Sequence, residues 1–326
     1  MGFRYRKSIK VMPGVRMTVS KSGVSTSVGG RGARVTRTAS GRVTKTVGVP
    51  GTGISKTSSV SAGKKGQPSA AASSPAKPGM LAPKGERLLY RALKGDQDIA
   101  AMESVAQNHP SHALAASTIA GALLFNSSPE RSAQLLQWVF DTQSDPADDE
   151  FLRKYVSGTI ELQIATGVSA DLELDRQSIG LMLGELHQAR GAHDAAISVV
   201  EQLEPTSIAA VSLAELYLDV QRYDEVVDLT DGLSNEDDAT ALLLVFRGHA
   251  LRQLGHFTAA RETLRDALRS TKRDPAIVQW ALAERAYAYL REGKRAQAKK
   301  DAEKLMSQDR SHPMLADLLA AIESSG

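Results

Sequence analysis

Four segments in the second half of the chain share one pattern of small residues, and this recurrence restricts the fold more than any other feature of the sequence. Each segment has a glycine or alanine, then a glycine or glutamine seven residues later, then an alanine or valine five residues after that. The first small residue recurs after 30, 34 and 38 residues. The positions are Gly184, Gly191 and Ala196; Ala214, Gln221 and Val226; Gly248, Gly255 and Ala260; and Ala286, Gly293 and Ala298. Such a period predicts stacked units that bury their apolar sides on one another.

The pattern within a unit predicts a pair of helices. From Gly85 onward apolar residues recur at the helical spacings i, i+3, i+4 and i+7. The first small residue would let two antiparallel helices approach closely, and the following glycine would end the first helix in a left-handed conformation. The unit resembles the tetratricopeptide repeat, a helix-turn-helix of about 34 residues. Residues 242–275 fit the repeat best, whereas the preceding unit has Gln221 at the turn.

We therefore expect an all-α solenoid over residues 85–326, with its clearest repeats at about 178–306. Residues 86–166 contain further helix pairs, which we interpret as hairpins of the same type without a definite repeat signature. The amphipathic segment at about 312–323 is predicted to be a capping helix, because a solenoid must cover its last apolar face.

The first 56 residues have a different period. Runs such as "VRMTVS" and "RVTKTVGV" alternate apolar and polar residues, and β-branched Val and Thr are abundant. Between the runs stand "SKSG", "GGRG", "ASG" and "PGTG", which supply the glycines of tight turns. This alternation predicts a small antiparallel β-meander over residues 1–56. The fold class is then α+β in separate domains: the meander, a flexible linker and the solenoid.

The same region resembles a short bacterial N-terminal module known as a domain of unknown function. The resemblance rests on "GFRYRKS", "SKSG", "SVGGRGA" and "VGVPGTGIS", which occur in order and cover about residues 2–56. The family implies no known activity, so it leaves the function open.

Residues 57–84 are predicted to be a disordered linker. They consist mainly of Ser, Ala, Pro, Gly and Lys, and they cannot bury enough apolar surface to offset the entropy of ordering. The charge of the chain also divides near this point. Residues 1–85 contain 16 Lys and Arg and no Asp or Glu, whereas residues 86–326 contain 24 Lys and Arg and 37 Asp and Glu. Two electrostatically opposite parts are therefore joined in one chain.

The sequence favours a protein without an enzyme site. Gly48 and Gly53 have the separation of a phosphate-binding loop, but Ile54 and Ser55 stand where Lys and Ser or Thr are required. The chain has no cysteine, and its seven histidines form no metal-binding motif. The acidic runs at 145–150 and 235–239 are interpreted as helix caps, with a divalent cation as the alternative. We expect no cofactor, no metal and no catalysis.

The N-terminal residues show no secretory signal. No apolar run follows Arg4, Arg6 and Lys7, and the longest apolar stretch, 113–125, is too short to span a bilayer. The expected location is the cytoplasm.

Two interaction surfaces are candidates for function. In the first, the resemblance implies a groove lined by the first helix of each repeat, which binds a peptide or partner protein. It places at the groove the apolar or small residues Leu181, Val211, Val245, Trp280 and Ala283 together with the candidate binding residues Glu185, Gln188, Glu215, His249, Arg252 and Tyr287. The alternative is that the polar side chains form an ordinary solvated face.

The second candidate is the basic β-module. Arginines on the polar faces of its strands suit contact with phosphate, although aromatic residues for stacking on bases are lacking. These residues are Arg4, Arg6, Arg16, Arg34 and Arg42. Nucleic acid, membrane headgroups and the acidic helical part of the same chain are possible partners, and self-association through open strand edges is another. The sequence therefore favours a protein-binding adaptor or scaffold, with an anionic-surface binder as the alternative.

Overall fold

The computed structural model describes residues 77–95, 97–156, 159–270 and 272–324 in full, and before residue 77 it describes the backbone of six strands. The strands are β1 (Arg6–Met12), β2 (Val15–Ser20), β3 (Gly23–Gly30), β4 (Ala33–Arg37), β5 (Val43–Gly48) and β6 (Ser55–Ser59). The β-meander of residues 1–56 and the linker of residues 57–84 fall mostly outside the fully described residues, so both stay predictions.

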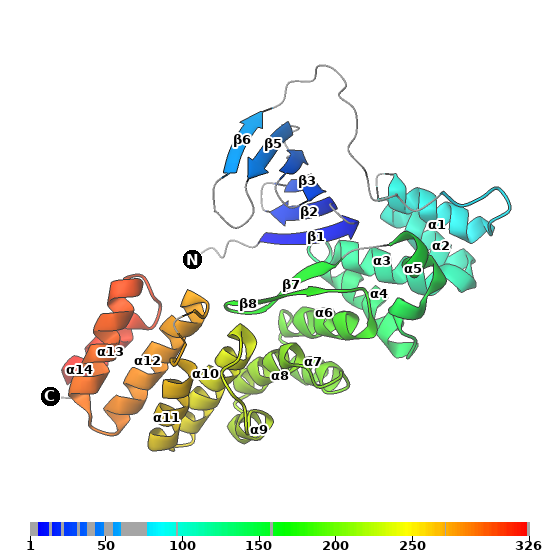
Figure 1. The fold of residues 1–326 in the computed structure, drawn as a ribbon. Helices are drawn as coiled ribbons and strands as arrows, with labels where there is room; N and C mark the ends of the chain where they lie inside the picture. Colours follow the sequence, from blue (N-terminus) through cyan, green and yellow to red (C-terminus); the bar gives the residue numbers. More distant parts are fainter. Residues whose placement is uncertain are drawn as a thin grey trace. The chain divides into compact units, whose positions relative to one another are not determined.

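Contacts divide the chain into two compact units. The first comprises Met1–Leu162 and Ala170–Leu186, and the second comprises Gln163–Ser169 and His187–Gly326. The helices up to α6 are α1 (Lys84–Lys94), α2 (Ile99–Asn108), α3 (Ala113–Leu124), α4 (Pro129–Asp141), α5 (Glu150–Tyr155) and α6 (Arg176–Gln188), with the 3-10 turns η1 (Pro110–His112) and η2 (Pro146–Asp148) (Figure 1).

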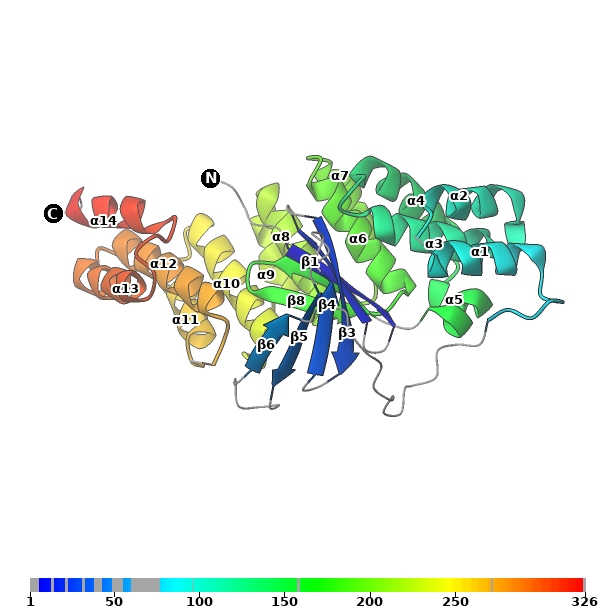
Figure 2. The ribbon, with the colours of Figure 1, turned by 90° about the horizontal axis from the view of Figure 1, so that it is seen from above.

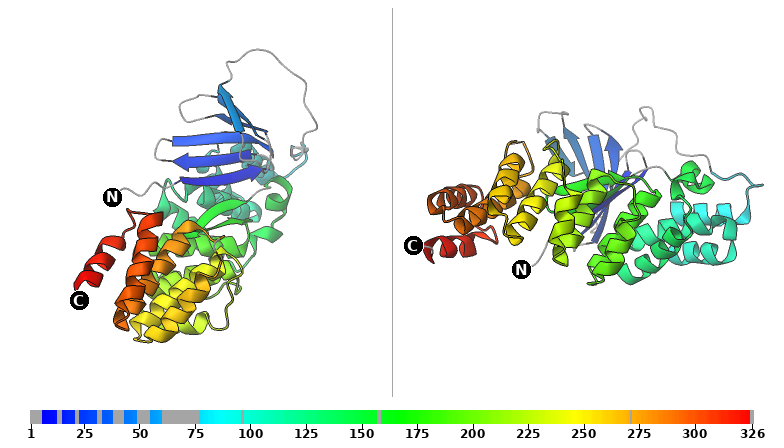
Figure 3. Two further views of the ribbon diagram at one scale, coloured as in Figure 1. Left: turned by 60° about the vertical axis from the view of Figure 1, so that its left-hand side comes forward. Right: turned by 90° about the horizontal axis from the view of Figure 1, so that it is seen from below.

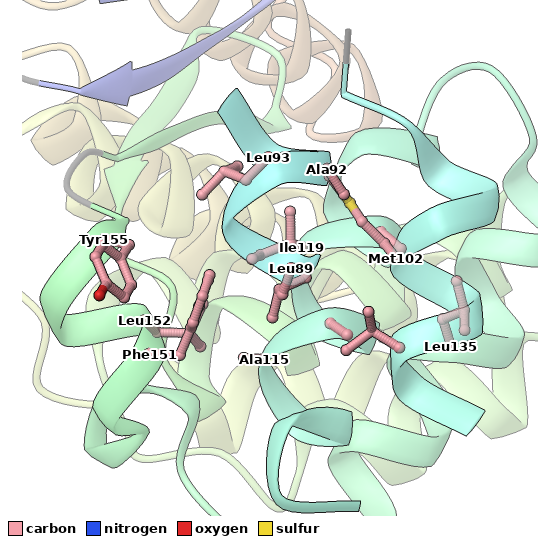
Figure 4. Packing of buried hydrophobic residues seen from close by; sticks show 13 residues of the cluster. Leu89, Ala92, Leu93, Met102, Ala115, Ile119, Leu135, Phe151, Leu152 and Tyr155 are labelled. Atoms are coloured by element: carbon pink, nitrogen blue, oxygen red, sulfur yellow. The ribbon is translucent and has the colours of Figure 1, made fainter. Parts of the chain in front are cut away.

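The core of the first unit lies among α1, α2, α3, α4 and α5. Leu89 and Met102 are fully buried, and Tyr155 is nearly so. Figure 4 shows the cluster to which these side chains belong, with Leu89 on α1, Met102 on α2 and Tyr155 on α5. The Tyr155 ring meets the Tyr90 ring edge-on, with centroids 5.0 Å apart, and its hydroxyl donates to Glu86 at 2.6 Å. This packing accounts for the helix pairs predicted in residues 86–166.

Two strands interrupt the region that the sequence predicts to be entirely helical. They are β7 (Ile160–Ala165) and β8 (Val168–Leu172), neighbours in a sheet joined by a two-residue turn. Alternate residues Ile160, Leu162 and Ile164 are buried, which is the period-two pattern of a strand. Gly167 at the turn has φ of +78°, a value that glycine adopts readily. The all-α prediction for residues 85–326 is therefore wrong over this hairpin.

The helices after α6 are α7 (His193–Val200), α8 (Ser207–Asp219), α9 (Tyr223–Leu229), α10 (Asp238–Gln253), α11 (Phe257–Ala267), α12 (Pro275–Arg291), α13 (Arg295–Gln308) and α14 (Leu315–Ser324) (Figures 1 and 2). Three pairs of them form successive hairpins, namely α8 with α9, α10 with α11 and α12 with α13. Helix α10 contacts its partner α11 and the first helices of the neighbouring hairpins, α8 and α12. The second helices α9 and α11 contact the next first helices, α10 and α12. The α10–α11 and α12–α13 hairpins lie side by side in both views of Figure 3. This is the stacked arrangement predicted from the repeat.

The turn residue of all four repeats has the left-handed conformation. The φ angles are +72° at Gly191, +60° at Gln221, +84° at Gly255 and +73° at Gly293. At each turn the residue after it donates its backbone N–H to the carbonyl five residues back, as His256 does to Leu251 at 2.8 Å. This is the Schellman end of a helix. Gln221 makes the same bonds as the glycines, so the unit that departs from the pattern keeps its turn geometry.

The small residues of the repeat lie where helices approach closely. Ala196, Val226, Ala260 and Ala298 are fully buried. A Cβ added at Gly248 on α10 would overlap the side chain of Leu264 on α11. The predicted role of the small positions is therefore confirmed at Gly248.

Candidate interaction face

The six predicted groove residues lie on first helices of the repeats. Glu185 and Gln188 belong to α6, Glu215 to α8, His249 and Arg252 to α10, and Tyr287 to α12. All six side chains are half-buried. The structure brings His249, Arg252 and Tyr287 together, whereas Gln188 is part of a separate contact.

A buried carboxylate joins α10 to α12. Glu284 on α12 is only 1% exposed and receives the Arg252 Nε–H on Oε2 at 2.7 Å. Its other oxygen, Oε1, lies 2.9 Å from Nδ1 of His249. Since an ionised carboxylate only accepts hydrogen bonds, Nδ1 of His249 must carry the proton. We refer to His249, Arg252, Glu284 and Tyr287 as the Glu284 cluster.

Burial alone would raise the pKa of Glu284. The hydrogen bonds and charges of His249 and Arg252 outweigh that effect, so the pKa lies below its ordinary value. Glu284 is therefore ionised at neutral pH. The Arg252 cation and the Glu284 anion offset each other within the cluster.

Two tyrosine rings contact the charged and imidazole groups of the cluster: Tyr287, which belongs to it, and Tyr223, which lies outside it. The Arg252 guanidinium lies 5.6 Å from the centroid of the Tyr287 ring. The ring centroids of Tyr223 and His249 are 6.2 Å apart. Burial raises the pKa of the Tyr287 hydroxyl, and the negative charges of Asp317 and Glu284 raise it further. Tyr287 therefore remains a neutral hydrogen-bonding group at physiological pH.

Gln188 belongs to a second contact. Its side-chain amide donates to Asp219 Oδ2 at 2.8 Å, and Nδ1 of His193 lies 3.7 Å from the same oxygen. This contact links the end of α6 to the end of α8. Glu185 and Glu215 occupy the preceding turns of these two helices.

Two parts of the sequence interpretation need correction. Leu181, Val211, Val245 and Ala283 are at most 1% exposed and belong to the core, because these helix positions face neighbouring helices. His249 and Arg252, predicted as binding residues with a solvated face as the alternative, both pair with the buried carboxylate of Glu284.

Sequence reasoning missed Glu284 itself. The available signal was its position on α12, three residues after buried Ala281 and four before buried Ala288. A carboxylate at these spacings shares the apolar face of the helix, where a charge requires a partner.

The acidic runs act as helix caps. Asp237 Oδ1 accepts from the backbone N–H of Thr240 at 2.8 Å, and Asp149 Oδ1 accepts from that of Leu152 at 3.0 Å. Asp145 likewise accepts from the backbone of Ala147 at 2.8 Å. Among the described residues, no group of His, Asp and Glu is arranged to hold a metal ion.

The predicted anionic-surface residues Arg4, Arg6, Arg16, Arg34 and Arg42 have side chains outside the described part of the structure. Their role stays a prediction. Within the described residues, no helix combines the length and the apolar character that a membrane crossing requires.

Stacked helix-turn-helix units of this kind define a tetratricopeptide-like helical repeat protein. The tetratricopeptide repeat family matches residues 241–274. A family described as "Protein of unknown function (DUF4236)" matches residues 3–57. The two resemblances inferred from the sequence are thus supported over these residues. A search of curated proteins found no match.

Several solved structures are similar in part. A tetratricopeptide repeat protein from Parabacteroides merdae is 14% identical, with a TM-score of 0.49 over 74% of this chain and 87% of that one. The N-terminal domain of the EccA1 ATPase of the ESX-1 secretion system of Mycobacterium tuberculosis is 16% identical, with a TM-score of 0.46 over 67% and 91%. MamA MSR-1 C2 is 17% identical, with a TM-score of 0.38 over 66% and 99%.

Proposed function

We propose that the helical part of this protein is a non-enzymatic scaffold that binds a peptide or partner protein through the first helices of its repeats. The observation that supports this most is the stacking of α8, α10 and α12, which places their half-buried polar and aromatic side chains in successive repeats. Helical repeats of this kind form extended binding surfaces. The proposed contact residues are Glu185, Gln188, Glu215, His249, Arg252 and Tyr287.

The Glu284 cluster supports a role for Tyr287 and Arg252 as contact residues. Tyrosine and arginine dominate the binding energy of many protein interfaces. Here the ion pair with Glu284 fixes the Arg252 side chain, whose guanidinium lies near the Tyr287 ring. A side chain that is already ordered loses less entropy when a partner binds.

The Glu284 cluster also decides which substitution tests the proposal. Replacing His249 or Arg252 with alanine would leave Glu284 buried without its partner and destabilise the fold. Tyr287→Ala removes a proposed contact and leaves the ion pair intact. Its matched control is Tyr289→Ala, a half-buried tyrosine on the same helix whose ring lies 5.7 Å from the Arg261 guanidinium.

The experiment is affinity capture from the native host with the wild type and both variants, followed by titration of the captured protein. We expect Tyr287→Ala to weaken binding by at least about tenfold, the loss typical of an interface residue worth more than 1 kcal/mol, while Tyr289→Ala binds as the wild type does. Equal partners and affinities for all three proteins would reject the assignment of this face.

A second candidate function rests on the charge division of the chain. Residues 1–85 carry 16 cations and no anion. A segment of this charge attracts anionic surfaces such as a nucleic acid backbone or lipid headgroups. In this alternative the helical part would serve as a scaffold for the basic module.

A further inference from the structure

One position of the repeat forms a row across three stacked helices. Glu215 on α8, His249 on α10 and Tyr287 on α12 each lie six residues before the left-handed turn residue that follows their helix. Helix α10 contacts both α8 and α12, so the stack sets these equivalent positions in a line. All three side chains are half-buried. We refer to Glu215, His249 and Tyr287 as the surface row.

The arginines of these helices add no net positive charge to the surface row. Helix α8 contains no lysine or arginine, and Arg252, beside the row on α10, is offset by the buried carboxylate of Glu284. Each remaining arginine of α10 and α12 contacts a second helix or the residues just after one. These contacts are Arg247 with Asp231 at 3.0 Å, Arg285 with Asp301 at 2.7 Å, and the Arg291 guanidinium with the Phe257 ring at 5.4 Å from its centroid.

Carboxylates give the surface row a negative charge. Glu215 belongs to the row, and the exposed side chain of Asp219 lies one turn further along α8. Asp219 contacts the Gln188 amide and the His193 ring, which carry no permanent charge. A third carboxylate, Asp317, is exposed on α14, a helix that contacts α12 and contains no lysine or arginine.

The tyrosine of the surface row responds to this charge and also suits a cation. Burial raises the pKa of Tyr287, and the carboxylates of Asp317 and Glu284 raise it further against the opposing effect of Arg252. The electrostatic field at the ring is therefore negative. Aromatic ring faces attract lysine and arginine side chains that approach within about 6 Å of the centroid.

We propose that the partner of the scaffold contacts the surface row through a segment rich in lysine and arginine. The assignment rests on the proposed function and adds the chemistry of the partner. Charge complementarity supports it, because Glu215, Asp219 and Asp317 attract a basic segment and repel an acidic one.

The test measures the binding of a fluorescent octa-arginine peptide to the full chain, with octa-glutamate as the reference probe. The row variant carries Glu215→Gln with Asp317→Asn, which removes two charges and keeps the shape of both side chains. Asp224→Asn with Asp228→Asn is the matched control, because it removes two exposed carboxylates from α9, a second helix. We expect octa-arginine to bind the row variant roughly fivefold more weakly than the wild type, and to bind the control as it binds the wild type.

A second pair of substitutions tests the ring. Tyr287→Phe keeps the aromatic face and should bind octa-arginine as the wild type does, whereas Tyr287→Leu should bind it about threefold more weakly. Circular dichroism checks that each variant is folded. Octa-arginine that binds no better than octa-glutamate, equal weakening by the row variant and the α9 control, or equal binding of the two Tyr287 variants would overturn the proposal.

The partner captured in the scaffold experiment separates this inference from the proposed function. We expect octa-arginine to displace that partner from the wild-type chain. A partner that Tyr287→Ala weakens but octa-arginine does not displace would keep the scaffold and overturn the basic segment. Capture that Tyr287→Ala leaves unchanged would instead reject the scaffold face itself.

The basic residues 1–85 of the chain itself are the alternative occupant. In that case, replacing the five arginines of the basic module with glutamine would strengthen octa-arginine binding in the wild-type background and leave it unchanged in the row variant. The arginines are Arg4, Arg6, Arg16, Arg34 and Arg42. That result would overturn the assignment of the surface row to a partner, whereas an equal effect in both backgrounds supports it.

Discussion

At the scale of single residues, Gly248 has the most demanding position in the repeat. A Cβ there would lie 2.7 Å from Cδ2 of Leu264 and closer still to its Cγ. Because the two helices would have to separate, we expect Gly248→Ala to lower the free energy of unfolding by about 1–3 kcal/mol. Urea denaturation followed by circular dichroism measures this change.

Gly79→Ala is the matched control for the Gly248 substitution. A Cβ at Gly79 would meet no atom within 4 Å, so the free energy of unfolding should change by less than about 0.5 kcal/mol. Equal stability of the two variants would show that α10 and α11 do not depend on the missing Cβ.

At the scale of elements, the ion pairs of Glu284 connect two neighbouring first helices. Glu284→Gln removes the charge that pairs with Arg252 and His249. Breaking a buried pair from one side costs about 3–5 kcal/mol, so α10 and α12 should hold together less well. We expect this loss in the free energy of unfolding at neutral pH.

The pH dependence of the Glu284 variant has a definite sign. Since the pKa of Glu284 is lower in the folded chain than its ordinary value of 4.5, the stabilisation is present above that value and is lost as the pH falls through the folded pKa. The wild type and Glu284→Gln should therefore converge in acid. Glu262→Gln is the control. The Glu262 side chain pairs with Arg261 and Arg265 but is 38% exposed, so these ion pairs should contribute less than about 1 kcal/mol to the free energy of unfolding. A difference between wild type and Glu284→Gln that is constant with pH would contradict the assignment.

At the scale of the whole molecule, the division of charge predicts how the chain responds to salt. If the basic module contacts phosphate, the affinity of the full chain for duplex DNA or anionic vesicles should fall steeply with ionic strength. Replacing its five arginines with glutamine should reduce the slope of log affinity against log salt by about one for each arginine that binds a phosphate group. The residues are Arg4, Arg6, Arg16, Arg34 and Arg42.

The control for the salt experiment changes five exposed arginines of the helical part. They are Arg153, Arg265, Arg269, Arg295 and Arg310. This variant has the same net charge as the first, so a slope that stays at the wild-type value would place the phosphate-binding surface in the basic module. Binding that is absent, or that both variants weaken alike, would reject the second candidate function.

The sequence alone determined the repeat, because its turns and small positions depend on local chemistry. A left-handed turn favours glycine, and a close approach of helices requires a small side chain, so Gly191, Gly248 and Gly255 were recognisable without a structure. Ile160, Leu162 and Ile164 also alternate with polar residues in the sequence. Because the hairpin is short and helical periods precede and follow it, the whole region was predicted to be helical.

Only the tertiary structure decided which side of each first helix is buried and which polar residues are paired. Val211 and Val245 were expected at the binding face and belong to the core, whereas His249 and Arg252 pair with a carboxylate more than thirty residues away. A helical period gives the spacing of a face but not the neighbour that covers it. That neighbour comes from the next repeat, and its position follows from the packing of whole helices.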